Sequence, residues 1–209
     1  MINRSSVSYP RLTKLFYINL KQNKDSSEWC LETIVAGKKI VINHQTFCDV
    51  FGYEFVKEGE SQDLDRKKML KEAKKEFFID SSIVKHQFTH SILEAEPKIL
   101  FTIFMRCIVP KDNSKELISD KVLLMMYAVM HNLHLDIPAI VMEHILYAAQ
   151  IGKKFVLPYS NLLTLFFKHF GISLDEEETV KEGFGTISEK SLQNIGVAQT
   201  EKGDWKSVV

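Results

Sequence analysis

Residues 119–171 read SDKVLLMMYAVMHNLHLDIPAIVMEHILYAAQIGKKFVLPYSNLLTLFFKHFG, and this stretch decides the fold class. Its apolar residues recur every three to four positions, which is typical of helices with one buried face. N-capping residues and helix-ending glycines interrupt the pattern at matching places. These signals predict three helices, from Ser119 or Asp120 to about Asn132, from Asp136 to near Gly152, and from Pro158 to Gly171.

A further buried helix is predicted just before this stretch, from Glu96 to Val109. Pro97 suits the first turn of that helix, and Pro110 ends it, because proline has no backbone N–H to donate within a helix. Together the four helices predict a helical bundle over residues 90–174.

Residues 1–56 predict a smaller subdomain with the order helix, β-hairpin, helix. The first helix begins at Pro10, with leucines and a phenylalanine at helical spacing after it. Two segments rich in β-forming residues, 29–36 and 39–42, predict the hairpin. Asn43 as N-cap and Gly52 after the last turn predict a short helix between them.

The remaining segments are more polar. Residues 57–89 form a charged excursion, whose most charged part we interpret as a solvated helix or a partly mobile segment. Residues 175–209 begin with four consecutive acidic residues and contain few large apolar side chains to offset the entropy lost on ordering. We therefore expect a tail that is poorly structured, either extended or held by contacts with the body. The predicted fold class is mainly α: a helical bundle with a small N-terminal hairpin and this tail.

Composition excludes a wholly basic, histone-like surface, because 27 Lys and Arg residues balance 27 Asp and Glu residues. The three cysteines, Cys30, Cys48 and Cys107, are odd in number and lack zinc-binding or redox spacing, which favours a reducing compartment. The longest apolar run, from Val122 to Met130, is roughly half a membrane span. We expect a cytoplasmic or nuclear protein with no membrane partner.

No catalytic motif is present: the chain contains neither a Gly-x-Ser-x-Gly elbow nor a Gly-x-x-x-x-Gly-Lys phosphate loop. His131 and His134 lie three residues apart, and Glu143 and His144 lie on the next predicted helix, so a metal site is one interpretation of these residues. The spacing lacks the glutamate of a zincin motif, and surface or helix-end histidines are the preferred interpretation. We expect no enzyme activity, cofactor or metal.

One basic stretch is a candidate for nucleic-acid binding. Its residues are Arg66, Lys67, Lys68, Lys71, Lys74 and Lys75, with Glu72 as the one acidic residue among them. In a helix, Lys67, Lys71, Lys74 and Lys75 would share a face that could meet phosphates. The preferred alternative is a solvated face, because acidic residues precede the stretch and no aromatic residues interleave with it for base stacking.

Several ordered motifs resemble a known family. They are Lys39-Ile40-Val41-Ile42-Asn43, Phe47-x-x-Val50-Phe51-Gly52, Ser119-x-Lys121-x-Leu123-Leu124-x-x-Tyr127-Ala128-Val129, Ile137-Pro138-x-Ile140-x-x-Glu143-His144-Ile145 and Phe155-Val156-Leu157-Pro158-Tyr159-x-x-Leu162-Leu163-x-x-x-Phe167, followed by Gly171-Ile172. The chain resembles, from about Pro10 to Asp175, the putative plant transposon protein domain, found in open reading frames of plant retroelements, including those related to Athila-type gag regions.

The resemblance implies the non-enzymatic portion of a retroelement, with a gag-like role in particle assembly, and it brings no catalytic residues with it. The chain departs from nucleocapsid regions because it lacks a Cys-x-x-Cys-type zinc knuckle, and it has no protease or polymerase motif. The leading hypothesis is a gag-like domain that binds itself or another protein. A nucleic-acid-binding module that uses residues 66–75 is the alternative, and an unrecognised enzyme is the third.

Overall fold

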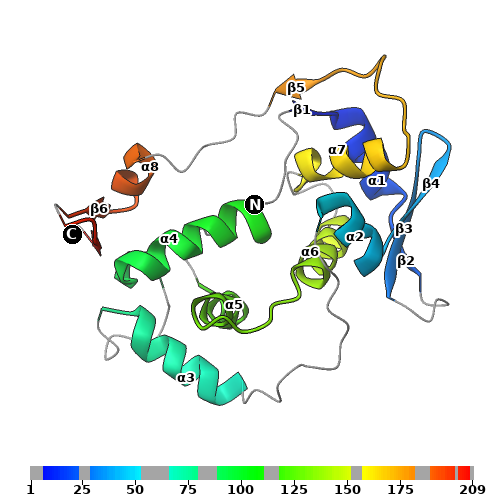
Figure 1. Cartoon of the computed structure of the whole chain (residues 1–209). Helices are drawn as coiled ribbons and strands as arrows, with labels where there is room; N and C mark the ends of the chain where they lie inside the picture. Colours follow the sequence, from blue (N-terminus) through cyan, green and yellow to red (C-terminus); the bar gives the residue numbers. More distant parts are fainter. Residues whose placement is uncertain are drawn as a thin grey trace. The chain divides into compact units, whose positions relative to one another are not determined.

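The computed structural model describes residues 7–23, 29–52, 66–79, 89–110, 118–151, 157–181, 189–200 and 202–207. The chain divides into two compact units, each built from two separate segments of sequence. The first unit comprises Met1–Lys57 and Asp136–Phe184, and the second comprises Glu58–Leu135 and Gly185–Val209. Figure 1 shows the elements of both units.

The first unit combines helices with a three-stranded antiparallel sheet of order β2–β3–β4. Its strands are β2 (Lys21–Asn23), β3 (Cys30–Val35) and β4 (Lys38–Ile42). Its helices are α1 (Pro10–Ile18), α2 (His44–Phe51), α6 (Ile137–Ile151) and α7 (Ser160–His169). A second, two-residue ladder pairs β1 (Val7–Ser8) with β5 (Val180–Lys181).

The predicted hairpin is confirmed as β3 and β4, whose last ladder pair joins Val35 to Lys38. Ala36 and Gly37 form the turn with φ of 48° and 78°, and positive φ at both central residues is what a type I′ turn requires. Strand β2 was not predicted. Its three polar residues form an edge strand without the alternation that marks a half-buried strand.

The predicted caps of α2 are confirmed. The Asn43 side chain accepts a hydrogen bond from the backbone N–H of Thr46 at 2.8 Å, and Gly52 adopts the left-handed conformation with φ of 70°. These contacts satisfy groups at both ends of the helix that no helical residue can pair. Helix α2 therefore has the bounds that its sequence indicates.

The core of the first unit lies between one face of the sheet and the four helices. The Thr33 hydroxyl on this face donates to the backbone oxygen of Phe16 at 2.8 Å and joins β3 to α1. Aromatic rings fill the centre, with centroids 6.3 Å apart for Phe16 and Phe167. The largest fully buried side chains here are Leu12, Phe16, Leu31, Ile40, Ile42, Phe47, Phe166 and Phe167.

The second unit contains α3 (Arg66–Phe77), a 3-10 turn (His90–Ile92), α4 (Ala95–Ile103), α5 (Asp120–Met130), α8 (Glu189–Asn194), β6 (Val197–Gln199) and β7 (Trp205–Ser207). Helix α4 confirms the helix predicted from Glu96. It continues as a π-helical turn, Phe104–Ile108, where the Val109 N–H donates to the Phe104 oxygen at 2.8 Å. Helices α3 and α4 both pack against α5.

The three helices of the opening stretch are confirmed within a few residues as α5, α6 and α7. Ser119 caps α5 by accepting from the Val122 N–H at 3.4 Å, and Asp136 caps α6 by accepting from the Ala139 N–H at 2.9 Å. Gly171 follows α7 with a φ of 64°.

A single bundle over residues 90–174 is not confirmed. The division between the two units falls at Leu135, so α4 and α5 belong to the second unit, while α6 and α7 belong to the first. Helix α5 packs against α3, whereas α6 packs against α2. Caps and periodicity determine where a helix begins and ends, but they do not determine which other element covers its apolar face.

The prediction of a poorly structured tail over residues 175–209 is wrong for the described part. Strand β5 pairs with β1 in the first unit, and α8 with the β6–β7 hairpin packs on α4 in the second. Order here comes from contacts with distant segments, in agreement with the expectation of a tail held by contacts with the body. In the predicted charged excursion, α3 is helical, while residues 57–65 and 80–88 lie outside the described residues.

Candidate functional site

All six basic residues of the candidate stretch lie on helix α3. Lys67, Lys71 and Lys75 follow one another at four-residue spacing, and all three are exposed. Residues at this spacing lie one above the other on a helix, with about 5–6 Å between neighbouring Cβ atoms. Arg66 and Lys68 are exposed as well. We call Lys67, Lys71 and Lys75 the lysine row.

Lys74 differs from the lysine row. It is half-buried, and its ammonium nitrogen lies 3.3 Å from Asp120 Oδ1 at the start of α5. This ion pair balances the charge of Lys74 within the protein. The shared face of four lysines predicted from the sequence is therefore reduced to three exposed ones.

The acidic residues of α3 point to α5 and not to the lysine row. Glu72 accepts a hydrogen bond from the Tyr127 hydroxyl at 2.8 Å, and Glu76 Oε2 lies 2.9 Å from His131 Nε2. Tyr127 lies in the last turn of α5 and His131 is the residue that ends this helix, and their ring centroids are 4.1 Å apart. We call these four residues the α3–α5 polar contact.

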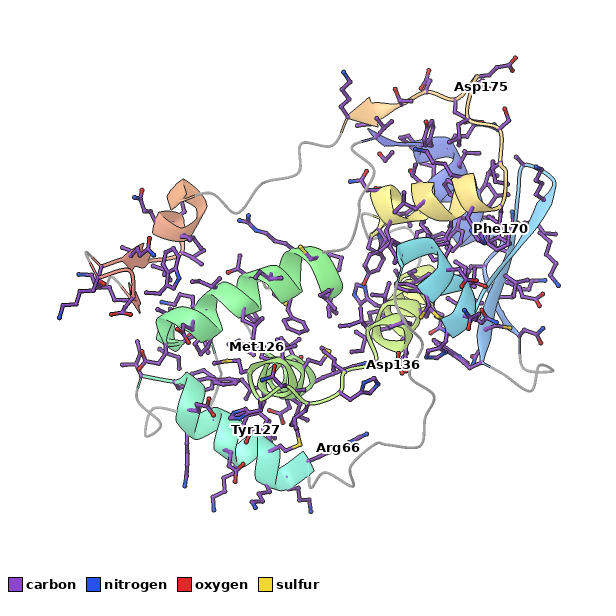
Figure 2. The ribbon with its side chains drawn as sticks, viewed as in Figure 1. Arg66, Met126, Tyr127, Asp136, Phe170 and Asp175 are labelled. Atoms are coloured by element: carbon purple, nitrogen blue, oxygen red, sulfur yellow. The ribbon has the colours of Figure 1, made fainter. Side chains whose placement is uncertain are left out.

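Apolar packing beside the polar contact fixes the rotation of α3 about its axis. Ala73 and Phe77 are fully buried, and the Phe77 ring centroid lies 6.2 Å from that of Tyr127. In Figure 2, Tyr127 extends from α5 at the side of α3, and nitrogen-tipped side chains extend from α3 away from α5. The outward face of α3 is therefore cationic, while its two carboxylates are engaged.

The polar contact also changes the acidity of Tyr127. The hydrogen bond to Glu72, together with burial and the negative charges of Glu72 and Glu76, raises the pKa of the Tyr127 hydroxyl above its usual value. Sequence reasoning missed this cluster. The sequence does show that Glu72 and Glu76 are four residues apart, and that Tyr127 and His131 are too. It does not show that α3 packs against α5.

Two of the histidines considered for a metal site have other partners. His131 contacts Glu76, and His144 Nδ1 lies 2.9 Å from the Tyr159 hydroxyl. Within the described ranges, no group of three or more His, Cys, Asp or Glu side chains is arranged to hold a metal ion. Cys48 is buried, and burial together with the charges of Asp49 and Asp136 raises the pKa of its thiol.

A second candidate surface lies on the first unit, around the sheet face away from the core. Ile34 of β3 is 56% exposed on this face, and Ile18, the last residue of α1, is 77% exposed. The Asn19 side chain, next to Ile18, donates to the Ile34 backbone oxygen at 2.8 Å and links the end of α1 to β3. On the same face, Glu32 accepts from Asn23 at 2.7 Å and pairs with Lys39 at 2.8 Å. These bonds lower the pKa of Glu32, first through Lys39 and then through Asn23.

Among the helices described, none combines the length and the apolar character that a membrane crossing needs. No curated protein and no solved structure matches the chain. A family model described as "Putative plant retrotransposon-related domain" matches residues 1–173, which is 173 of the 209 residues. This match confirms the resemblance to a plant transposon protein. The chain belongs to the family of putative plant retrotransposon-related domains and is derived from a plant retroelement.

Proposed function

We propose that this retroelement-derived chain is a non-enzymatic binding domain of the kind found in Athila-type gag regions, and that it associates with a second copy of itself. The observation that supports this most directly is the exposure of two large apolar side chains, Ile34 on the outer face of the sheet and Ile18 at the end of α1, which Asn19 links to Ile34. Large apolar side chains that lie together on a surface mark a site of interaction more often than isolated ones.

The surroundings of the pair favour a second copy as the partner. Ile34 lies opposite Lys39 in the β3–β4 ladder, and the ion pair between Lys39 and Glu32 lies diagonally across the same face. A two-fold interface uses the same patch on both copies, and a face with an exposed apolar residue and charges of both signs can meet itself with unlike charges opposite each other. Burying one isoleucine fully stabilises the contact by about 1.5–3 kcal/mol.

Light-scattering chromatography over a range of protein concentrations tests this function. We expect the wild-type chain to form dimers as concentration rises, and Ile34→Lys and Ile18→Lys to remain monomers. Val129→Lys is the matched control, because Val129 is also an exposed apolar residue, 43% exposed, but lies on α5 in the other unit. The proposal is refuted if the wild-type chain and the Val129→Lys control both stay monomeric at every concentration.

A second candidate function, nucleic-acid binding, is favoured by the lysine row. Three exposed cations at one-turn spacing can follow a phosphate backbone, and the carboxylates of α3 are turned toward α5. The proposed ligand is the sugar–phosphate backbone of a single- or double-stranded nucleic acid, contacted without base recognition. The absence of aromatic residues in α3 before Phe77 agrees with backbone contact alone.

Charge reversal tests the second candidate. The triple variant Lys67→Glu, Lys71→Glu, Lys75→Glu should abolish binding of a labelled RNA, and single variants should each reduce the slope of log K against log salt by roughly 0.7–0.9. The control reverses Lys14, Lys168 and Lys181, which are exposed lysines of the first unit. Equal loss in both triple variants would mean that net charge, and not the lysine row, determines binding.

A further inference from the structure

Strand β4 is an edge strand of the three-stranded sheet. Among the described strands its one ladder partner is β3, and in Figure 1 no other labelled strand lies on the far side of β4 from β3. An edge strand directs half of its backbone N–H and C=O groups away from the sheet, where they can pair with an added strand. What β4 can bind therefore depends on which of its residues carry these groups.

The turn of the β3–β4 hairpin determines which backbone groups of β4 point outward. A two-residue type I′ turn joins the strands, and its flanking residues, Val35 and Lys38, form a hydrogen-bonded pair. Hydrogen-bonded and non-hydrogen-bonded pairs alternate along an antiparallel ladder. Lys39 and Val41 therefore belong to non-hydrogen-bonded pairs, and their N–H and C=O groups point away from β3.

Both outward-pointing residues are accessible at this edge. Their side chains lie on the outer face of the sheet, where Lys39 is 62% exposed and Val41 is half-buried, while Ile40 between them is buried in the core. Within the ranges that the structure describes, neither Lys39 nor Val41 makes a backbone hydrogen bond outside the ladder. The edge thus presents the N–H and C=O groups of two residues.

A second copy of β4 is complementary to this edge. When two β4 strands run antiparallel about a two-fold axis at Ile40, Lys39 of each copy lies opposite Val41 of the other. Both pairs then join outward-pointing residues, so each pair exchanges two N–H···O=C hydrogen bonds, and the two Ile40 residues form the non-hydrogen-bonded pair between them. The backbone pattern of β4 therefore fits its own copy in this register.

Side-chain charge selects this register over its neighbours. Lysine at a sheet edge opposes pairing when it meets another lysine, because like charges directly opposite each other destabilise a strand pair. A register centred on Lys39 would place two ammonium groups opposite each other, and one centred on Val41 would place Lys39 opposite Asn43, the cap of α2. In the first register, Lys39 lies between Val41 of the second copy and Ile34 of its own chain.

We propose that β4 pairs edge to edge with β4 of a second copy of this chain and joins two three-stranded sheets into one continuous sheet. The inference rests on the proposed self-association for the choice of partner, but it names a different surface, because Ile18 and Ile34 take no part in the edge. The two-fold axis is perpendicular to the sheet, so the outer faces of both copies lie on the same side.

Disulfide cross-linking between two full-length variants tests the register. Residues opposite each other in a hydrogen-bonded pair have Cα atoms about 5.5 Å apart, which a disulfide can span. Under mild oxidation, Lys39→Cys mixed with Val41→Cys should give a cross-linked dimer of the two variants at several times the yield of either variant alone. Identical residues lie diagonally, about 7–8 Å apart, which is too far for an unstrained disulfide.

Two further substitutions are present in both variants. Cys107→Ser removes the half-buried native thiol, and Ile18→Lys removes the contact on which the proposed function depends. Edge pairing alone buries little apolar surface, so it is captured by cross-linking at concentrations where light scattering still gives the mass of a single chain. Circular dichroism checks that both variants fold as the wild type does.

Amide exchange gives a second measurement without added cysteines. In Ile18→Lys, the protection of the Lys39 and Val41 amides should rise several-fold with protein concentration, because each N–H donates across the edge. Gln22 is the matched internal control. Leu31 directs its backbone groups toward β4, so Gln22 opposite it on β2 directs its N–H outward at the other edge of the sheet. The protection of the Gln22 amide should not change with concentration.

The outcomes separate edge pairing from the proposed function. A cross-link that requires both cysteine positions, together with concentration-dependent protection of Val41, supports edge pairing even when the exposed isoleucines fail their own test. Equal cross-linking yields from the mixture and from the single variants, or Val41 protection that does not depend on concentration, overturn edge pairing even when wild-type dimers depend on Ile18.

Discussion

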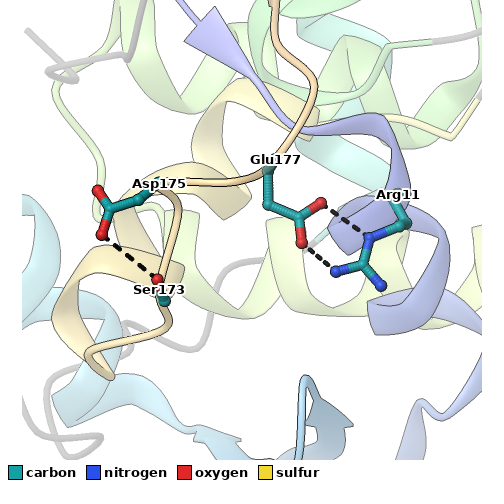
Figure 3. Close-up of polar contacts among 4 residues, drawn as sticks. All are labelled: Arg11, Ser173, Asp175 and Glu177. Carbon is teal, nitrogen blue, oxygen red and sulfur yellow. Dashed lines mark hydrogen bonds and ion pairs between the residues drawn. The ribbon is translucent and has the colours of Figure 1, made fainter.

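At the scale of single residues, side-chain hydrogen bonds between distant segments shift the pKa of two titratable groups. Tyr127 and Glu177 are the clearest cases, since each has its pKa moved by one partner more than by burial. The partner of Tyr127 is Glu72, fifty-five residues earlier in the chain. The partner of Glu177 is Arg11, whose guanidinium donates to both carboxylate oxygens (Figure 3).

The raised pKa of Tyr127 predicts a loss of stability in alkaline solution. A group with a raised folded pKa contributes stability that is fully present below the unfolded value, near 10 for tyrosine, and that disappears as pH rises through the folded pKa. A difference titration of phenolate absorbance between wild type and Tyr127→Phe should show this hydroxyl ionising above pH 10. In Glu72→Gln its midpoint should be lower, and an unchanged midpoint would contradict the assigned cause.

The lowered pKa of Glu177 predicts the opposite dependence, in acid. A group with a depressed folded pKa contributes stability that is present above its unfolded value, about 4.3, and that is lost as pH falls through the folded pKa. The protection of the Val180 amide, which is its exchange rate compared with that of an unfolded chain at the same pH, should therefore fall below that value in wild type. In Arg11→Gln the protection should already be low at neutral pH and change less in acid, whereas identical profiles would show that Glu177 does not hold the β1–β5 region.

At the scale of elements, several helix ends in the described part of the chain follow from residues within four positions of the end. Asn43, Ser119 and Asp136 each accept a backbone hydrogen bond three residues ahead. The start of α7 is an exception. Tyr159 precedes this helix with a φ of 62° and provides no side-chain cap, and its hydroxyl contacts His144. At this helix start, the contact between Tyr159 and His144 of α6 takes the place of a capping side chain.

The cap of α2 provides a measurable case. Replacing Asn43 with alanine removes the acceptor of the Thr46 N–H and should lower the free energy of unfolding by about 0.5–2 kcal/mol in urea denaturation. Gln45→Ala is the control, because Gln45 is exposed on the same helix and bonds only within it in the contacts described, to Asp49. Equal effects of the two substitutions would mean that the cap contributes nothing beyond helix propensity.

At the scale of the whole molecule, the chain passes from one compact unit to the other and back, so each unit is completed by a late segment of sequence. The first unit closes with β5 on β1, and the second with the C-terminal segment, residues 189–207, on α4. Each unit therefore has apolar clusters of its own, such as Phe16 with Phe167 in the first unit and Phe77 with Tyr127 in the second.

Because each unit has its own core, a substitution that creates a cavity in one core should destabilise that unit and not the other. Phe77→Ala should reduce the protection of amides in α3 and α5 by about 3–5 kcal/mol in native-state hydrogen exchange, because it removes a fully buried ring. Amides in α6 and α7 should keep their protection. Phe167→Ala is the reciprocal variant, with its effect in the first unit. Uniform loss in both units from either variant would show a single cooperative core.

The sequence by itself determined the local features of this protein: the bounds of α2, α4, α5 and α6, the β3–β4 hairpin, the basic character of α3 and the family. These depend on caps, turns and periodicity that involve neighbouring residues, or on the order of motifs. Only the tertiary structure decided the division at Leu135, the pairing of α3 with α5, the turning of Lys74 toward Asp120 and the ordering of the C-terminal segment. Those features arise from contacts between residues that lie some fifty to a hundred positions apart. The burial of an apolar face can be satisfied by any complementary surface that the rest of the chain provides.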